Sequence, residues 1–297
     1  MDNWTDSVKS LQGASVKVRK DYNHPLIPKK EPHYQWPEVT QLVATAIEEG
    51  ERVYLAGPAS TGKSSLIRQI GAFKRQPVTR VNFNRDVSVE DFLGHHEIEN
   101  GKMSFHYGVL PMAMKEGHIL LLDEIDAIQP AVAFILQSVL EPEGLLFIPP
   151  TGETVLPHKD FGICATANTK GYGDASGLYS LGTHSANHSQ LDRWGLIIDM
   201  DYLPAKTERK LLEALYPEVE TSDLQIIERA IKDLRVSFKN KSLMAPITLR
   251  SLQALCRMRV RRITWSQALI YTVLNKSPEE DHRVIREVFQ RHGAVMD

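Results

Sequence analysis

The sequence contains few cysteines and no long apolar run. Two cysteines, Cys164 and Cys256, occur in 297 residues, far apart and each in apolar surroundings. This usage excludes a disulfide framework and favours reduced thiols in the core of a cytosolic protein. No apolar stretch is long enough to cross a bilayer, and the polar start of the chain lacks the core of a signal peptide. We therefore expect a cytoplasmic protein with no membrane association.

The chain also has little net charge. Its formal charge is −2 at pH 7, and no stretch interleaves basic with aromatic residues. These features argue against nucleic acid or a membrane surface as the main partner. Apolar residues make up 42% of the chain and charged residues 24%, which is typical of a globular protein. The length suffices for one large domain and one smaller domain.

The stretch with the clearest chemical meaning is residues 57–64, which has the spacing G-x-x-x-x-G-K-S. It follows the apolar run 53–56 and precedes a helical pattern. A strand, a glycine-bounded loop and a helix N-terminus in this order direct backbone N–H groups toward one point, where a phosphate chain binds. We predict that this P-loop binds ATP through the following residues: Gly57, Pro58, Ala59, Ser60, Thr61, Gly62, Lys63, Ser64 and Ser65.

Each fixed residue of the P-loop has a chemical task. Gly57 and Gly62 allow a tight turn and a close approach of the backbone to phosphate oxygens. Lys63 is predicted to reach the β and γ phosphates, and Ser64 to ligate Mg²⁺. The alternative is an ordinary glycine-rich turn that happens to precede a lysine.

A second motif, Asp123 and Glu124, comes directly after the apolar run 119–122. In a P-loop fold the first carboxylate holds the Mg²⁺ shell, and the second orients and polarises the attacking water. We therefore assign Asp123, with Ser64, to the metal and Glu124 to catalysis. The alternative is an acidic loop after a buried strand.

Three further polar side chains complete the predicted catalytic set of Lys63 and Glu124. Asn168 follows an apolar run and is placed to bind the γ-phosphate or the lytic water, unless it is a simple turn residue. Arg193 is interpreted as a finger for the next subunit's site, worth about 10³–10⁵ in rate, rather than a surface partner of Asp192. Arg250 opens a helix and is placed to swing over the γ-phosphate, unless it is merely a solvated helix residue.

Histidines invite a second metal hypothesis. His184 and His188 lie four residues apart, and a further group gathers in one segment, namely His95, His96 and His106. No cysteine or nearby carboxylate in the sequence completes a tetrahedral set with them. We therefore expect no protein-bound metal other than Mg²⁺ and assign no function to His184 or His188.

Short apolar runs alternate with helical patterns across residues 37–204. This rhythm predicts an α/β domain with a parallel sheet covered by helices on both faces, and phosphate at the carboxyl ends of the strands. The strands are expected at 53–56, 78–83, 119–122, 161–165 and 196–200, and the helices at 37–50, 62–74, 88–94 and 129–140.

Two predicted hairpins interrupt this rhythm, at residues 95–107 and 144–157. The first is centred on an Asn-Gly turn and is inserted into a helical pattern that resumes at Val109. Hairpins that project from a rigid sheet are usual places for contact with a partner.

The two ends of the chain differ from the central domain. Residues 1–36 show no sustained period, so we expect an extended arm that is either a solvated tail or a strap over the nucleotide base or a neighbouring subunit. Residues 205–297 keep a helical period and are expected to form a small all-α lid domain.

The order of these motifs resembles that of the AAA+ ATPases of the MoxR class, whose defining insertions are a hairpin within the second helix and another before the sensor-1 strand. Residues 171–179, residues 182–194 and the run Asp123-Glu124-Ile125-Asp126-Ala127 look like those of the CobS-type subunits of aerobic cobaltochelatases. The similarity covers roughly residues 33–204.

The resemblance implies a role for each site residue. Lys63, Ser64, Asp123 and Glu124 match the nucleotide and Mg²⁺ residues of the family. The remaining matches are Asn168 as sensor 1, Arg193 as the finger, Arg250 as sensor 2, and Asn82 as the residue that ties Glu124 to subunit contacts. The resemblance also implies a homo-oligomeric, hexameric ring and a partner with a von Willebrand factor A domain, similar to CobT.

Two functions remain open from the sequence. The first is the motor of a cobalt chelatase or chelatase-like assembly, in which ATP hydrolysis drives Co²⁺ into a corrin held by a third, large subunit. The second is a MoxR-type chaperone that remodels a protein complex without inserting metal. In both, the hairpins 95–107 and 144–157 are expected to transmit force to the partner.

Overall fold

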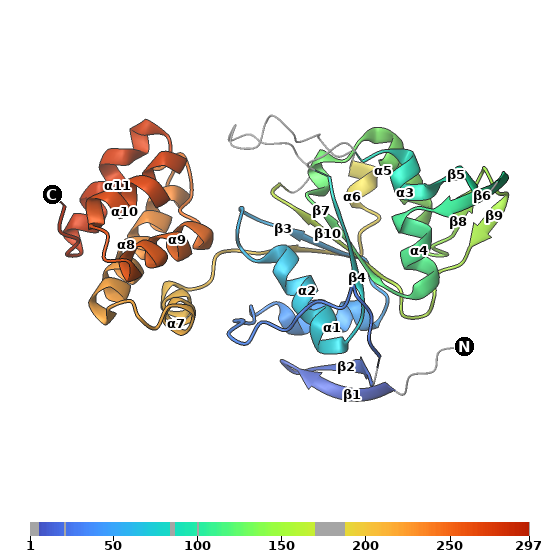
Figure 1. The fold of residues 1–297 in the computed structure, drawn as a ribbon, viewed down its shortest axis with the longest axis horizontal. Helices are drawn as coiled ribbons and strands as arrows, with labels where there is room; N and C mark the ends of the chain where they lie inside the picture. Colours follow the sequence, from blue (N-terminus) through green and yellow to red (C-terminus); the bar gives the residue numbers. More distant parts are fainter. Residues whose placement is uncertain (1–5, 21, 84–86, 100, 170–187, 297) are drawn as a thin grey trace. The chain divides into compact units, whose positions relative to one another are not determined.

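The computed structural model describes residues 6–20, 22–83, 87–99, 101–169 and 188–296, which form two compact units (Figure 1). The first unit comprises the described residues within 1–31, 36–57 and 62–200, and the second comprises those within 32–35, 58–61 and 201–297.

The first unit is built on a five-stranded parallel sheet. Its strands follow the spatial order β11-β3-β10-β7-β4, and every neighbouring pair is parallel. All residues of β3, β7 and β10 are buried, as expected for strands covered on both faces. The α/β prediction is therefore confirmed. The strand bounds are β3 (Val53–Ala56), β4 (Val78–Asn82), β7 (Ile119–Asp123), β10 (Gly162–Ala167) and β11 (Leu196–Asp199).

Two apolar cores lie on opposite faces of this sheet, because alternate strand residues point to opposite sides. Val53 and Leu55 pack into one core with α1 and α2, whereas Tyr54 and Ala56 pack into the other with α4 and α5. Figure 1 shows these helix groups on the two sides of the sheet. The helices are α1 (Thr40–Glu48), α2 (Lys63–Lys74), α3 (Val89–Leu93), α4 (Val109–Glu116), α5 (Pro130–Val139) and the short α6 (His188–Leu191).

Both predicted hairpins are present. The antiparallel strands β5 (Gly94–Glu99) and β6 (Lys102–Tyr107) lie between α3 and α4, so a hairpin does interrupt a helical segment. Ser88 caps α3 in a capping box with Asp91. The second hairpin pairs β8 (Leu146–Ile148) with β9 (Glu153–Val155) just before β10.

The N-terminal segment, expected to be an extended arm without a sustained period, contains an antiparallel hairpin of β1 (Asp6–Leu11) and β2 (Ala14–Arg19). The reason is a short alternation in β2: Ala14, Val16 and Val18 are buried in the core shared with α1 and α2. A strand of six residues with one buried face is enough to pair when a helix covers that face.

The second unit is helical and has its own apolar core. Thr248 and Thr264 cap α9 and α10 by accepting a backbone N–H in the first turn of each helix. Pro278 directly precedes α11, and the first turn of this helix consists of acidic residues. The helices are α7 (Ala205–Leu215), α8 (Thr221–Lys239), α9 (Leu249–Val260), α10 (Trp265–Thr272) and α11 (Glu279–Arg291), with 3-10 turns η1 (Ile125–Ala127) in the first unit and η2 (Leu274–Lys276) here.

Both cysteines are buried and free, as predicted. Burial raises the pKa of the Cys164 and Cys256 thiols to about 12, so both remain protonated and unreactive at neutral pH. Within the described part of the chain, no helix has the length and apolarity needed to cross a membrane.

Candidate active site

The P-loop joins β3 to α2, and its two motif glycines hold backbone conformations that other residues disfavour. Gly57 has a φ of +144°, and a Cβ atom there would lie 2.1 Å from the carbonyl oxygen of Met200. Gly62 has a φ of +92° and precedes the first residue of α2. Among the described residues no side chain caps α2, and its first turn holds no acidic residue. The backbone N–H groups at the start of α2 are therefore available to bind an anion.

Replacing Gly57 by alanine should abolish ATP binding and lower the free energy of unfolding by about 1–3 kcal/mol, because the new Cβ meets a backbone atom and a left-handed φ is strained. Gly50→Ala is the matched control, since Gly50 also has a positive φ but has no neighbour within 4 Å of an added Cβ. Thermal unfolding and fluorescent nucleotide titration measure the two effects. Normal ATP binding by Gly57→Ala would show that the close approach to Met200 is not needed.

Lys63 begins α2 and is 7% exposed. Its Nζ donates to the carbonyl oxygen of Gly57 at 2.6 Å and to Oδ1 of Asn168 at 3.3 Å. The predicted phosphate lysine and the predicted sensor asparagine therefore meet at the carboxyl ends of the adjacent strands β3 and β10.

Ser64 and Asp123, the two predicted Mg²⁺ residues, are in direct contact. Ser64 Oγ donates to Asp123 Oδ1 at 2.6 Å, and Thr166 Oγ1 donates to the same oxygen. Arg80 of β4 donates through Nε to Asp123 Oδ2 at 2.7 Å. Both carboxylate oxygens of this buried residue are thus engaged by donors from three different elements.

These contacts determine the charge of Asp123. Burial by itself would raise the pKa of this carboxyl, but hydrogen bonds from Ser64, Thr166 and Arg80, together with the Arg80 charge, hold the pKa below its usual range. A depressed folded-state pKa adds stability above the unfolded-state pKa, and that stability is lost as the pH falls through the folded value. Asp123 is therefore a carboxylate at neutral pH.

Glu124 has a left-handed backbone, with φ +58° and ψ +45°. Its N–H donates to Thr166 Oγ1 at 3.3 Å, the hydroxyl that also donates to Asp123. A residue with a side chain rarely adopts this conformation, and such residues gather at functional sites. Thr166 thus links the backbone of the predicted catalytic carboxylate to the predicted metal carboxylate.

Asp126 binds the backbone of the loop that contains Asn168. Its Oδ2 accepts the backbone N–H groups of Asn168 at 3.0 Å and of Thr169 at 3.2 Å. Asp126 is 7% exposed, and its carboxylate orients the backbone at the end of β10. The Asn168 side chain is thereby directed to Lys63.

The residues at the end of β7 suit Mg²⁺. A serine hydroxyl and an ionised carboxylate are hard oxygen donors, and they lie 2.6 Å apart at the start of α2 and the end of β7. Mg²⁺ typically binds through one or two protein oxygens and completes its octahedral shell with water and substrate phosphate. The donor set at Ser64 and Asp123 therefore fits this ion.

The two predicted arginines come from other elements of the chain. Arg193 donates through Nε to Glu141 Oε1 at 2.7 Å. Arg250 is the second residue of α9 in the second unit and is exposed. Their assigned roles stay predictions, as does that of Asn82, which lies opposite Asp123 in the pairing of β4 with β7.

The rest of the predicted set is distributed as follows. Thr61 Oγ1 donates to the Pro58 carbonyl at 3.0 Å, and Ser60 has a φ of +63°. His184 and residues 171–187 of the CobS-like segment lie outside the described residues. The sequence pattern assigns no role to Arg80, Thr166 or Asp126, the three side chains that hold Asp123 and Asn168 in place.

Comparison with known proteins identifies the family. Residues 52–183 match the AAA domain of the dynein-related subfamily. The chain is 32% identical over 310 residues to the aerobic cobaltochelatase subunit CobS of a Sinorhizobium species, across 97% of this chain and 90% of CobS. It is also 31% identical over 202 residues to YojN, an uncharacterized protein of Bacillus subtilis strain 168, across 66% of this chain and 62% of YojN.

A solved structure shares the fold. NtrX of Brucella abortus matches with a TM-score of 0.56 at 15% identity, across 87% of this chain and 61% of the NtrX chain. At this identity the likeness concerns architecture alone.

Proposed function

The chain belongs to the family of AAA ATPases that includes the cobaltochelatase subunit CobS, and from this premise we propose that it hydrolyses ATP with Mg²⁺ in a ring that drives a partner complex. The observation that carries the proposal is the group formed by Lys63, Ser64, Asp123 and Asn168. Hydrogen bonds of 2.6–3.3 Å join these side chains in two pairs at the carboxyl ends of β3, β7 and β10. Ligands of open parallel sheets bind at this edge.

The proposed roles follow from these contacts. Lys63 exchanges its present acceptors, the Gly57 carbonyl and Asn168, for the β and γ phosphates of ATP. Glu124 accepts a proton from the attacking water, and Asn168 orients that water or the γ-phosphate. Reaction at this edge needs positioning and charge compensation more than covalent chemistry, as in other phosphoryl transfers.

Ser64 and Asp123 would hold Mg²⁺, which supplies charge neutralisation between the β and γ phosphates when bound. Asp123 suits this task because its carboxyl is ionised by its hydrogen-bonding neighbours. Arg80 and Thr166 keep the carboxylate in one orientation.

We further propose that copies of the chain assemble into a hexameric ring and that each ATP site is completed by Arg193 of a neighbouring copy. In this scheme residues 37–204 bind the nucleotide, residues 205–297 act as a lid, and Arg250 reaches the γ-phosphate. The support is the family and the cluster above, together with the position of Arg193 just before the last strand of the sheet.

The hairpin β5–β6 offers a surface for a partner. Ile98 and Met103 are 70% and 69% exposed and face each other across the two strands, so they form an apolar pair on one side of the hairpin. We propose that this pair contacts a partner with a von Willebrand factor A domain, similar to CobT. The assembly then either drives the insertion of cobalt into a corrin or remodels a protein complex.

A reconstitution experiment tests the proposed function. The purified chain is mixed with a von Willebrand factor A-domain partner and a corrin-binding large subunit, and ATP turnover and Co²⁺ incorporation are followed together. Coupled turnover and incorporation support a chelatase motor, and partner-stimulated turnover without incorporation supports the remodelling chaperone.

The hairpin variant Ile98→Ser with Met103→Ser sharpens this test. We expect it to lower the ratio of stimulated to unstimulated turnover at least about tenfold, because both apolar contacts of the exposed pair are lost. A chain that never turns over ATP, with or without partners and Mg²⁺, would contradict the proposed function as a whole.

A further inference from the structure

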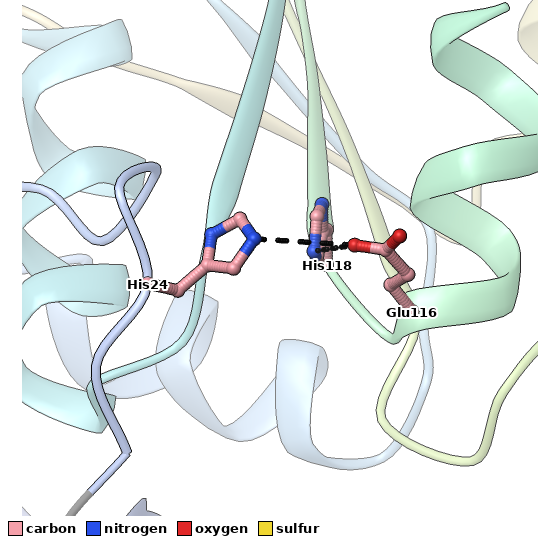
Figure 2. A group of neighbouring side chains, drawn as sticks. All are labelled: His24, Glu116 and His118. Carbon is pink, nitrogen blue, oxygen red and sulfur yellow. Dashed lines mark ion pairs between the residues drawn. The ribbon is translucent and has the colours of Figure 1, made fainter.

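A group of side chains of the types that can ligate a metal lies at the amino ends of the strands, at the opposite edge of the sheet from the P-loop. It contains His24, Glu116 and His118, whose ligand atoms all lie within 4.8 Å of one another (Figure 2). His118 Nε2 lies 3.1 Å from Glu116 Oε2, and His24 Nε2 lies 4.0 Å from the same oxygen. In Figure 2 the His118 ring lies between the His24 ring and the Glu116 carboxylate, and His24 comes from a separate segment of the chain.

His118 is the fixed member of this group. It is fully buried, and its Nδ1 lies 2.9 Å from Thr79 Oγ1. With the ring proton on Nδ1, this contact is a donated hydrogen bond, and Nε2 presents its lone pair to Glu116 and His24. The 3.1 Å contact of His118 Nε2 with Glu116 Oε2 lacks hydrogen-bond geometry, and Nε2 has no other hydrogen-bond partner among the described residues. A buried imidazole that is oriented through Nδ1 and leaves Nε2 outside any hydrogen bond is an arrangement typical of a metal ligand.

Charges of both signs surround the group. Arg19 places a positive charge near the group, because its Nη2 donates to the carbonyl oxygen of Gly117 at 3.1 Å. The Arg19 guanidinium is balanced by Asp160 at 3.2 Å. Glu116 is half exposed and supplies negative charge.

The two segments that carry the ligands are each fastened to the domain. Gly117, with a φ of +67°, turns the chain between Glu116 and His118, and its carbonyl accepts hydrogen bonds from Arg19 and Gln76. The segment around His24 is held by the bond from the Val78 N–H to the Leu26 carbonyl and by the bond from Arg75 to the Tyr22 carbonyl. The group is therefore largely prearranged.

We propose that His24, Glu116 and His118 bind Zn²⁺, with water as the fourth ligand, and that the ion ties the N-terminal segment to the start of β7. Two imidazoles and a carboxylate are a common set of zinc ligands. In a tetrahedral zinc site, neighbouring ligand atoms lie about 3.4 Å apart. Closing the 4.0 Å gap needs a small movement of His24. Binding through Nε2 also replaces the hydrogen bond that His24 Nδ1 accepts from the Leu26 N–H at 3.2 Å.

This site is separate from the ATP site. β7 runs from Ile119 to Asp123, so His118 lies about 16 Å from Asp123 at the usual rise of an extended strand. The ion would act on the stability of the N-terminal segment and leave the hydrolytic chemistry to the opposite edge.

The test uses the full chain stripped of metal and titrated with Zn²⁺ against a chromophoric chelator, in excess Mg²⁺ so that Ser64 and Asp123 are occupied. The expected result is one tight site, with His24→Ala and Glu116→Gln each weakening Zn²⁺ at least about 100-fold, because even the loss of an outer-shell partner costs 10–100-fold. Zn²⁺ should raise the melting temperature of the native chain and not that of these variants.

His95→Ala with His106→Ala is the matched control, because it removes two histidines from the β5–β6 hairpin instead. It should keep the native Zn²⁺ affinity. Co²⁺ added in place of Zn²⁺ should give the intense visible bands of tetrahedral coordination in the native chain and in this control. The proposal is overturned if no tight site exists, or if the affinity survives in His24→Ala and Glu116→Gln.

Discussion

Replacing Glu124 by Gln should reduce ATP turnover by about 10²–10⁴-fold while leaving ATP binding intact. The amide keeps the size of the side chain but cannot accept a proton from water. The left-handed backbone at Glu124 and the bond from its N–H to Thr166 do not depend on the side-chain charge, so the loop should keep its shape. Steady-state phosphate release and nucleotide titration separate the two effects.

Glu143→Gln is the control for this prediction, because Glu143 is an exposed carboxylate outside the cluster. It should leave turnover within about twofold of the native chain, as expected for a surface position. If Glu124→Gln hydrolyses ATP at the native rate, Glu124 is not the base. If it also fails to bind ATP, its role is to shape the loop rather than to act on water.

Replacing Arg193 by alanine should lower turnover by about 10³–10⁵-fold, the range found for arginine fingers. The physical reason is the loss of a guanidinium that offsets charge developing on the γ-phosphate of a neighbouring copy. Arg193 is ion-paired with Glu141 at 2.7 Å in the single chain, so the proposed finger role requires Arg193 to exchange this partner on assembly.

Glu141→Gln distinguishes a finger from a structural arginine. It removes the charge that holds Arg193 but keeps the guanidinium, so turnover should be retained or increased. A structural ion pair would instead make Glu141→Gln and Arg193→Ala equally harmful, with matching losses in melting temperature. Phosphate release and thermal unfolding on both variants decide between these outcomes.

The sequence predicts most of the first unit because its strands are continuous apolar runs. Such runs as 119–122 are unambiguous when helical patterns lie on either side, and the Asn-Gly pair marks the β5–β6 turn. The β1–β2 hairpin is harder to predict, since only Ala14, Val16 and Val18 alternate and the next residue, Arg19, is also buried. The hairpin forms because α1 and α2 pack over its apolar face.

The candidate site shows the same division. Lys63, Ser64, Asp123 and Asn168 follow from motifs because each stands beside a strand end whose position is predictable. Their supporting partners do not, because contacts across a sheet leave no local pattern. Arg80, for example, lies in an edge strand and looks like a solvated residue until β4 is placed beside β7.

The zinc group illustrates an extreme case. His24 comes from the N-terminal segment, whereas Glu116 and His118 flank the turn between α4 and β7. The histidines that are close in sequence predict no metal site. The three residues that the fold brings together are His24, from one segment, and Glu116 and His118, from another. Only the folded arrangement brings them within reach of one ion.

The most direct test of the central claim mixes Arg193→Ala chains, which keep Lys63, with Lys63→Ala chains, which keep Arg193. If each site is shared between two copies, mixing these inactive variants should restore turnover at interfaces that combine the intact halves, roughly a quarter of them by random pairing. Mixing Lys63→Ala with Glu124→Gln should restore none, because both changes damage the same half. Absence of recovery at every ratio of the first pair, in chains shown to co-assemble, would contradict a site completed by a neighbouring copy.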